Sequence, residues 1–217
     1  MSKIGIIVSG GSIDDDFALE FLKTKKVDVM IAVDRGLEFV YRYGLVPTHI
    51  VGDFDSINPD VIYYYKNETK IPIREFNPVK DASDTEIAIR LAIELGVEEL
   101  WILGGTGTRL DHVMANIQSL KIALDVGVKA YLLDKHNRIS LLSERIVLMR
   151  QFAYGKYFSV FSLGGKVEGL SISGAKYPLS KHTLEPYDSL SVSNQYAQDE
   201  VIIEFNNGTI ILMETRD

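Results

Sequence analysis

The chain has 217 residues, of which 46% are hydrophobic and 24% charged, and this composition excludes a disordered or collagen-like protein. Its 23 basic and 30 acidic residues give a net charge of −7, which argues against nucleic acid as the main partner because phosphate backbones attract basic surfaces. The absence of cysteine excludes disulfides, thiolate metal sites and cysteine nucleophiles, so that any metal must be bound by oxygen or imidazole.

The apolar segments of the chain are too short for a signal peptide or a membrane span. Met1–Val8 is too short for a signal peptide and has no small-residue cleavage site. No segment approaches the roughly 18 to 20 apolar residues of a membrane span. We therefore expect a cytoplasmic protein with no membrane partner.

Strand-like and helix-like segments alternate from the start of the chain to about Asn137. Strands are predicted at Ile4–Val8, Val29–Val33, Thr48–Val51, Ile71–Phe76, Leu100–Leu103 and Lys129–Leu133. Helices are predicted at 14–25, 37–43, from Asn58-Pro59 onward, at 83–95 and at 111–125. Ser83 and Glu86 have the spacing of a capping box at the start of one helix. The alternation predicts an α/β domain with a mostly parallel, Rossmann-like sheet and flanking helices.

After about Arg138 the helical periodicity stops. Strands are predicted at Ser140–Leu148, Tyr157–Leu163, Leu170–Ser173, Ser189–Ser193, Val201–Phe205 and Thr209–Met213. Asn206-Asn207-Gly208 predicts a tight hairpin, because Asn and Gly tolerate the positive φ of such turns. This part of the chain therefore predicts a smaller antiparallel β-sandwich or barrel.

Acidic residues gather where strands of the first part end. Thirteen aspartates fall in residues 1–138, and only Asp188, Asp199 and Asp217 follow. Ligands of an open parallel sheet bind beyond the carboxyl ends of its strands, and four charged clusters are predicted there. Carboxylates from separate loops repel one another unless a cation lies between them, and an oxygen-only set suits Mg²⁺ with substrate phosphates. The clusters are Asp34 with Arg35, Asp53 with Asp55, Asp81 with Asp84, and Arg109 with Asp111 and His112.

Structural roles are the alternatives for several of these residues. Asp34 or Asp84 alone can be a helix cap, and His112 can be a polar loop residue. Asp14–Asp16 opens a helix, where the helix dipole and solvation explain it without catalysis.

The segment from Asp53 to Asp55 favours a functional pair. If the chain there is extended, both carboxylates point the same way while Phe54 packs inward.

Two glycine-rich turns, Gly10-Gly11 and Gly104-Gly105-Thr106-Gly107, can bring backbone amides close to phosphates. Neither has the Gly-Lys-Ser/Thr of a Walker A motif or the Gly-x-Gly-x-x-Gly of a dinucleotide site. Arg35, Lys80 and Arg109 are the basic residues best placed to neutralise phosphate oxygens.

Four motifs, in the same order and with similar spacing, resemble those of thiamine pyrophosphokinases. They are Asp34-Arg35-Gly36, Gly52-Asp53-Phe54-Asp55-Ser56, Lys80-Asp81-x-Ser83-Asp84-Thr85-Glu86 and Gly104-Gly105-Thr106-Gly107-x-Arg109-x-Asp111-His112-x-x-x-Asn116. The resemblance spans nearly the whole chain. It implies a nucleotide-binding catalytic domain over residues 1–137 and a thiamine-binding β-sandwich over 138–217. It also implies a homodimer that uses Mg²⁺ to transfer the β,γ-pyrophosphoryl group of ATP to the hydroxyl of thiamine, releasing AMP.

The resemblance also implies roles for the matched residues. Asp53, Asp55 and Asp81 look like metal ligands, and Asp84 is expected to join them in catalysis. Nucleotide contacts are expected from Gly10, Gly11, Asp34, Arg35, Gly105, Thr106, Gly107, Arg109, Asp111 and His112.

In the second domain the segment Ser191-Val192-Ser193-Asn194 resembles the strand that binds thiamine across the dimer interface. Thiamine contacts are thus expected from Ser191, Ser193 and Asn194, although an ordinary strand end and turn would also explain the last two. Some relatives have a late tryptophan that this chain lacks, because its one tryptophan is Trp101. Another residue must therefore stack on the thiamine ring.

Two other functions fit the same residues. One is a different Mg²⁺-dependent transferase or hydrolase on the same scaffold, since a fold does not fix a substrate. The other is a non-catalytic sensor of thiamine or nucleotide. Release of AMP separates the first from a pyrophosphokinase, and binding without turnover would indicate the second.

Overall fold

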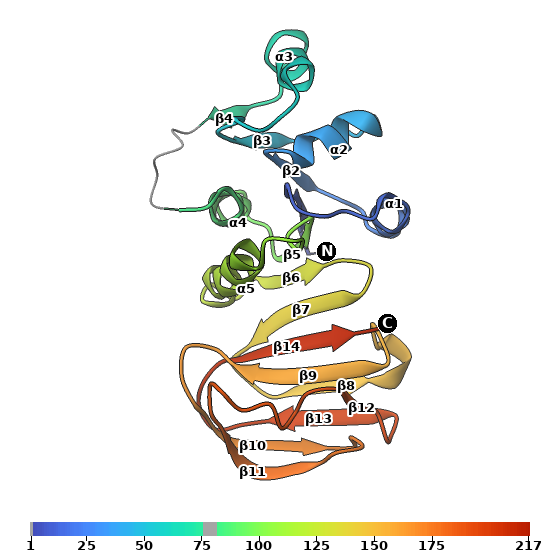
Figure 1. Cartoon of the computed structure of the whole chain (residues 1–217), viewed down its shortest axis with the longest axis vertical. Coiled ribbons are helices and arrows are strands. Elements are labelled where there is room, and N and C mark those ends of the chain that lie inside the picture. Colours follow the sequence, from blue (N-terminus) through green and yellow to red (C-terminus); the bar gives the residue numbers. More distant parts are fainter. Residues whose placement is uncertain (1, 76–81) are drawn as a thin grey trace. The chain divides into compact units, whose positions relative to one another are not determined.

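Figure 1 shows the fold as a computed structural model, which describes residues 2–75 and 82–217. The chain divides into two compact units, unit 1 (Met1–Lys135) and unit 2 (His136–Asp217). Among the described residues, no helix has the length and apolar character needed to cross a membrane.

Unit 1 alternates strands and helices. Its strands are β1 (Ile4–Val8), β2 (Val29–Val33), β3 (His49–Gly52), β4 (Ile73–Glu75), β5 (Glu99–Leu103) and β6 (Lys129–Leu133). Its helices are α1 (Asp15–Thr24), α2 (Gly36–Arg42), α3 (Pro59–Glu68), α4 (Asp84–Glu94) and α5 (Leu110–Leu124). The six strands pair in parallel in the order β6-β5-β1-β2-β3-β4, which confirms the predicted parallel α/β sheet.

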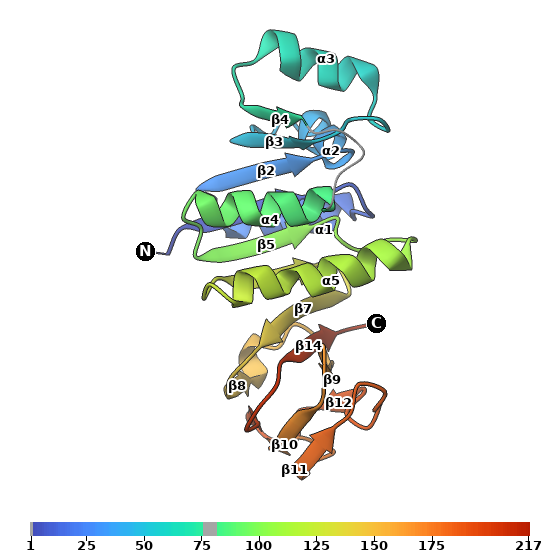
Figure 2. The ribbon, with the colours of Figure 1, turned by 90° about the vertical axis from the view of Figure 1, so that its left-hand side faces the viewer.

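Both faces of this sheet are covered. Helices α1 and α2 lie on one face and α4 and α5 on the other (Figures 1 and 2). The central strand β1 is accordingly an apolar run, and Ile6, Ile7 and Val8 are completely buried. The edge strand β4 has only three residues and is largely exposed.

Side chains cap two helices, and the cap of the second, Ser83, is the one that the sequence predicts. Asp14 accepts a hydrogen bond from the Phe17 amide at the start of α1, at 3.0 Å. Ser83 accepts one from the Glu86 amide at the start of α4, at 3.2 Å. The predicted capping box is only half formed, because the Glu86 carboxylate accepts two hydrogen bonds from the Arg90 guanidinium, one turn further along the helix.

The strand order creates a switch point beside β1. The chain moves outward from β1 through β2, β3 and β4 and then returns to the other side of β1 to form β5. Beyond the two strand ends the backbones stay paired: the amides of Ser9 and Gly11 donate to the carbonyl oxygens of Leu103 and Gly104, each at 2.8 Å. The site described below lies at this edge.

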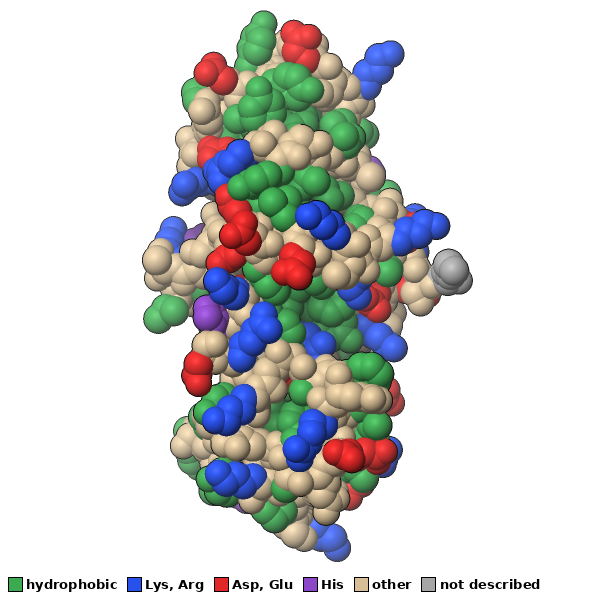
Figure 3. Space-filling model, turned by 90° about the vertical axis from the view of Figure 1, so that its right-hand side faces the viewer, with side chains coloured by type: hydrophobic (Ala, Val, Ile, Leu, Met, Phe, Trp, Pro, Cys, Tyr) green, Lys and Arg blue, Asp and Glu red, His purple; other side chains and the backbone are tan. Residues whose placement is uncertain are grey.

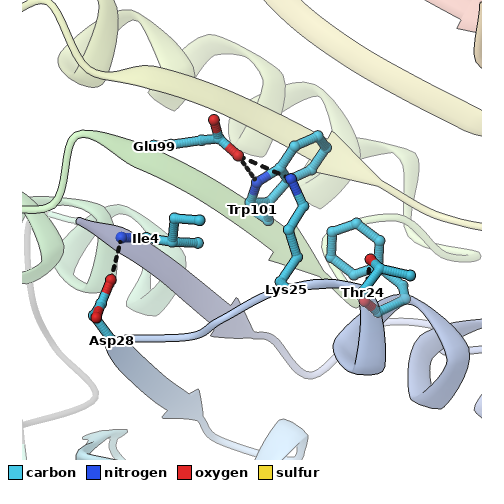
Figure 4. A network of polar contacts seen from close by, with 7 residues as sticks. Ile4, Thr24, Lys25, Asp28, Glu99 and Trp101 are labelled. Carbon is cyan, nitrogen blue, oxygen red and sulfur yellow. Dashed lines mark hydrogen bonds and ion pairs between the residues drawn. The ribbon is translucent and has the colours of Figure 1, made fainter. Parts of the chain in front are cut away.

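A polar network closes the opposite, amino-terminal edge of the sheet (Figure 4). The Glu99 carboxylate accepts hydrogen bonds from Trp101 Nε1 at 2.6 Å and from Lys25 Nζ at 3.0 Å, and Lys25 Nζ lies 4.2 Å from the centre of the Trp101 ring. Burial works to raise the pKa of Glu99, but the two hydrogen bonds outweigh it and hold the pKa below its usual value. Trp101 is 7% exposed and stacks on Tyr131, which confirms its predicted place in the core.

Aromatic side chains gather on α2 and α3. Tyr41 of α2 meets Tyr64 of α3 edge to face, with ring centres 5.2 Å apart, and Tyr65 is buried beneath them. Hydrophobic side chains are visible over these helices at the upper end of Figure 3. The cluster joins the two helices at a distance from the switch point.

Unit 2 is a sandwich of two antiparallel sheets. Its strands are β7 (Asn137–Leu142), β8 (Ile146–Met149), β9 (Tyr157–Ser162), β10 (Val167–Ser173), β11 (Leu179–Leu184), β12 (Asn194–Gln195), β13 (Glu200–Glu204) and β14 (Ile210–Thr215), with a short 3-10 helix at Arg150–Phe152. The sheets have the orders β12-β9-β14-β7 and β11-β10-β13-β8. Buried side chains from both sheets, including Phe158, Leu170 and Ile203, form one core. The predicted β-sandwich is confirmed.

Two predicted strands of unit 2 are wrong, and strand β11 is not predicted. The segment Ser140–Leu148 is two strands, β7 and β8, joined by a turn. Ser189–Ser193 is a series of turns. The polar strand β11 has no predicted counterpart, because Ser180, Lys181 and Thr183 break the apolar pattern and the strand lies at a sheet edge, where polar residues are tolerated.

The Asn206-Asn207-Gly208 turn also differs from its prediction. Strand β13 before it pairs with β8 and β10, whereas β14 after it pairs with β7 and β9. The turn therefore carries the chain from one sheet to the other and closes no hairpin. Turn residues specify a reversal of direction, but tertiary packing decides which strands then pair.

Candidate functional site

A cavity of about 530 Å³ opens in unit 1 at the carboxyl ends of β1, β2 and β5. This is the switch point, where loops and helix starts converge and where the sequence predicts a ligand site. The cavity is lined by residues 9–12, 33–35, 56, 83–85, 104–109, 112–113 and 116.

Most of the predicted nucleotide contacts line this cavity. They are Gly10, Gly11, Asp34, Arg35, Gly105, Thr106, Gly107, Arg109 and His112. Of the predicted catalytic residues, Asp84 also lines it. Asp55 and the predicted nucleotide contact Asp111 lie next to lining residues in the chain, and Asp53 bonds the lining residue Asp34 through its amide. Lys80 and Asp81 lie outside the described residues.

Three carboxylates from separate loops influence one another at the cavity. Asp34 follows β2 and accepts a hydrogen bond from the amide of Asp53, which follows β3, at 3.2 Å. Burial raises the pKa of Asp34 to about 7, with further contributions from the charge and hydrogen bond of Asp84 and from the charge of Asp53, against a hydrogen bond from the Phe54 amide. Asp34 is therefore protonated in part near neutral pH, because burial and the neighbouring carboxylates disfavour its charged form.

The end of β3 is shaped around Asp34. A Cβ atom on Gly52 would collide with Asp34 Oδ1, so that only glycine fits there. Phe54 has a φ of +59°, so the segment from Asp53 to Asp55 is a turn. The predicted extended alternation is therefore wrong, although Phe54 is half-buried and Asp55 is exposed.

The two glycine-rich turns lie against each other. The amide of Gly11 donates to Gly104 and the amide of Ser12 donates to the Thr106 carbonyl oxygen at 2.7 Å, so neither amide is available to a phosphate. A Cβ on Gly11 would clash with the carbonyl oxygens of Gly104 and Thr106, which explains the glycine by close backbone approach. The amides of Thr106 and Gly107, by contrast, find no acceptor among the described residues.

Basic side chains stand at the mouth of the cavity. Arg35 is exposed at the start of α2, and no described residue forms an ion pair with it. Arg109 precedes α5, and its guanidinium lies 2.6 Å from the Asp111 carboxylate. The hydrogen bond from Arg109 lowers the pKa of Asp111 to about 2, so this exposed pair is fully charged at neutral pH. His112, on the first turn of α5, is exposed.

Three lining residues have no role assigned from the sequence. Ser9 and Thr85 are buried where β1 ends and α4 begins, and their hydroxyl oxygens are 2.7 Å apart. The buried Asn116 side chain donates to the Gly105 carbonyl oxygen at 2.8 Å and ties the loop to α5. Only their positions in the sequence could have singled them out. Ser9 directly follows a buried strand, and Thr85 and Asn116 lie within two of the four motifs.

In unit 2 the three predicted thiamine contacts differ in exposure. Ser191 is buried and its hydroxyl donates to a backbone carbonyl of β9. Asn194 is completely buried and holds the backbone of Tyr177, accepting from its amide at 3.0 Å and donating to its carbonyl oxygen at 2.8 Å. Ser193 is exposed and has a φ of +57°. Tyr177 itself is 53% exposed.

The side chains of Ser191 and Asn194 thus satisfy the backbone of the protein. The exposed side chains of this segment are Val192 and Ser193, and the exposed Tyr177 is joined to it through Asn194. A polar residue that is buried among backbone donors and acceptors must bond them, because an unsatisfied group there is costly.

Comparison with known proteins gives two family matches. The family described as "Thiamin pyrophosphokinase, catalytic domain" matches residues 22–132, which is more than half of the chain, and "Thiamin pyrophosphokinase, vitamin B1 binding domain" matches residues 143–210. A thiamine pyrophosphokinase of Bacillus subtilis is 27% identical over 195 residues, which cover 89% of this chain and 90% of that protein.

Solved structures agree over the whole chain. The crystal structure of thiamine pyrophosphokinase from Bacillus subtilis has a TM-score of 0.88 at 27% identity and covers 99% of this chain and 100% of its own. The thiamin pyrophosphokinase of Geobacillus thermodenitrificans has a TM-score of 0.85 at 27% identity, with 99% and 98% covered. The yeast enzyme, at 17% identity and a TM-score of 0.82, shows the fold.

Proposed function

The chain belongs to the thiamine pyrophosphokinase family and is an enzyme that transfers the β,γ-pyrophosphoryl group of ATP to thiamine, and from this premise we propose that the cavity of unit 1 binds the ATP. One observation carries this proposal: carboxylates, an arginine and two backbone amides meet at one switch point, and neither the arginine nor the amides have a partner among the described residues. The volume of the cavity, about 530 Å³, lies in the range of roughly 300 to 1,000 Å³ that is usual for cofactor sites.

We assign the phosphate chain of ATP to the side of the cavity that carries Arg35, Arg109 and the amides of Thr106 and Gly107. Arg35 is free to approach a phosphate, whereas Arg109 must leave Asp111 to do so. Guanidinium groups bind phosphate oxygens in pairs, and amides in a glycine turn approach them closely. Gly10 and Gly11 lie on the same side, Gly10 against Arg35 and Gly11 against Thr106, and they supply shape more than hydrogen bonds, because the Gly11 amide is occupied.

The carboxylates fit a divalent cation. Burial and the charges of Asp84 and Asp53 disfavour the charged form of Asp34, and a cation at this place would stabilise that form. No three carboxylate or histidine side chains among the described residues already converge on one point. We propose that Asp53, Asp55, Asp81 and Asp84 hold Mg²⁺ together with phosphate oxygens, since Mg²⁺ usually takes one or two carboxylates and completes its shell with substrate and water. When bound, the ion would offset the charge of the phosphates.

The protein's own part in the reaction is positioning. Attack at the β-phosphorus requires the thiamine hydroxyl in line with the departing AMP, and a fixed geometry can supply most of the acceleration. Arg35 and Arg109 would balance the negative charge that develops as AMP leaves. Asn116, by holding Gly105, keeps the loop amides in place.

We propose that thiamine contacts Ser193 and Tyr177 of unit 2 in a homodimer whose active sites each use two chains. Asn194, next to Ser193, fixes the backbone of Tyr177, whose side chain is half-exposed. An exposed aromatic ring on a fixed backbone offers the stacking surface that a thiazole or pyrimidine ring requires. Asn194 then acts on thiamine through Tyr177, and Ser191 ties its segment to β9.

The direct test is incubation of the protein with ATP, MgCl₂ and thiamine, followed by mass identification of the products. We expect thiamine diphosphate and AMP, and we expect Asp55→Asn to lower their formation by orders of magnitude. Asp16→Asn, an exposed substitution in the first turn of α1, is the matched control and should leave the rate unchanged. Formation of ADP would instead indicate a different transferase or hydrolase, and binding without turnover would indicate a sensor.

A further inference from the structure

A pair of hydroxyl groups crosses the floor of the cavity. Ser9 follows β1 and Thr85 lies in the first turn of α4, 76 residues later, with their side-chain oxygens 2.7 Å apart. Ser9 is 5% exposed and Thr85 is 6% exposed, and both line the cavity. The pair is therefore nearly enclosed by protein, with the cavity as its opening.

The count of protons shows what the pair lacks. Each hydroxyl has one proton, and a single O–H···O bond between them uses only one of the two. Among the described residues, no further hydrogen-bond partner exists for either hydroxyl. Whichever residue donates to the other, one O–H is left over among the described residues, and an acceptor in the cavity can reach it because both residues line the cavity.

We propose that this hydroxyl pair donates a hydrogen bond to a phosphate oxygen of the nucleotide, an inference that rests on the proposed function of the cavity. A phosphate oxygen suits the donor because it accepts without donating. Thr85 lies in the first turn of α4, where the positive end of the helix dipole favours an anion. The bond between the two hydroxyls also strengthens the outward donor, because hydrogen bonds in a chain polarise one another.

The pair has a property that an ordinary binding residue lacks, because either hydroxyl can be the outward donor. If one is removed, the other keeps a proton and can turn it toward the ligand. Loss of both removes the donor altogether. Removing both together also leaves no buried hydroxyl without a partner, so the fold should be retained.

The test compares Ser9→Ala, Thr85→Val and the double variant by calorimetric titration with ATP in the presence of MgCl₂. A hydrogen bond to a charged group predicts that the Kd for ATP rises about ten- to a hundredfold in the double variant. Each single variant should lose much less affinity for ATP. The losses of binding free energy in the two single variants should therefore add up to less than the loss in the double variant. Thr85→Ser keeps both hydroxyls and should bind as the wild type does.

Titration with adenosine separates a phosphate contact from a general distortion. The Kd for adenosine should be the same for wild type and double variant, because adenosine has no phosphate. An equal loss for adenosine and ATP, or an ATP affinity that survives in the double variant, would overturn the proposal. Failure of the wild type itself to bind ATP would instead refute the proposed function of the cavity.

Discussion

Replacing Asp34 by Asn should stabilise the protein at alkaline pH while it impairs the enzyme. Asn accepts the hydrogen bond from the Asp53 amide as Asp does, and its own amide can donate to the Asp84 carboxylate. Asn also tolerates the φ of +45° at this position. The substitution thus removes a carboxylate from the cluster with little change of shape.

The pKa of Asp34 gives the sign and the size of the effect. In the folded protein it is about 7, against an ordinary value of 3.8, so the fold binds this proton more tightly than the unfolded chain does. Stability from this group is therefore fully present below pH 4 and is lost as the pH rises through 7. A difference of about 3 pKa units corresponds to about 4 kcal/mol at most, and screening of a partly exposed carboxylate reduces this to about 1–2 kcal/mol.

Urea unfolding, followed by the fluorescence of Trp101 in the core of unit 1, measures the effect at pH 4 and pH 8 without nucleotide and with EDTA. We expect the unfolding free energy of Asp34→Asn to exceed that of wild type by about 1–2 kcal/mol at pH 8 and to match it at pH 4. Asp16→Asn, which removes a carboxylate from the first turn of α1, should bring no gain. A variant no more stable than wild type at pH 8, or equally stabilised at both pH values, would refute carboxylate repulsion at this site.

Two further predictions concern the composite site and the glycine turns. Asp55→Asn and Tyr177→Ala homodimers should each be nearly inactive. Equal mixing with subunit exchange should restore about a quarter of wild-type thiamine diphosphate formation, because half of the dimers are then mixed and each mixed dimer has one intact site. No recovery after confirmed exchange would contradict a shared site. Gly11→Ala should lower the unfolding free energy by at least about 2 kcal/mol in chemical denaturation, because the added Cβ meets two carbonyl oxygens. Gly165→Ala should change the unfolding free energy by less than about 0.5 kcal/mol, because the space around Gly165 is open. Equal effects at the two glycines would show that the turns do not need this close approach.

The sequence predicts unit 1 better than unit 2 because the signals of unit 1 are local. A buried parallel strand such as β1 is an apolar run, and caps such as Asp14 and Ser83 act within one turn. Strand β11 has no comparable signal, and the turn at Gly208 does not reveal which sheet the next strand joins. Such features depend on packing between segments distant in sequence.

The same limit applies to the candidate site. Position after a strand singles out Asp34, and position before a capped helix singles out Asp84. Their effect on each other cannot be predicted in this way, because 50 residues separate them. Ser191 and Asn194 have the polarity of ligand contacts, and their hydrogen bonds to the backbone cannot be read from residue type. The Ser9–Thr85 pair likewise exists only once the fold has brought β1 and α4 together.

The paired turns at Gly11 and Gly104 have a thermodynamic consequence for any ligand of the cavity. Three successive hydrogen bonds, from Ser9, Gly11 and Ser12, extend the sheet past its last strand residues and fix the backbone of both turns before a ligand arrives. The loss of chain entropy in these turns therefore belongs to folding, and it does not subtract from the affinity for the ligand. An enzyme organised in this way can release its product without unravelling its own binding surface.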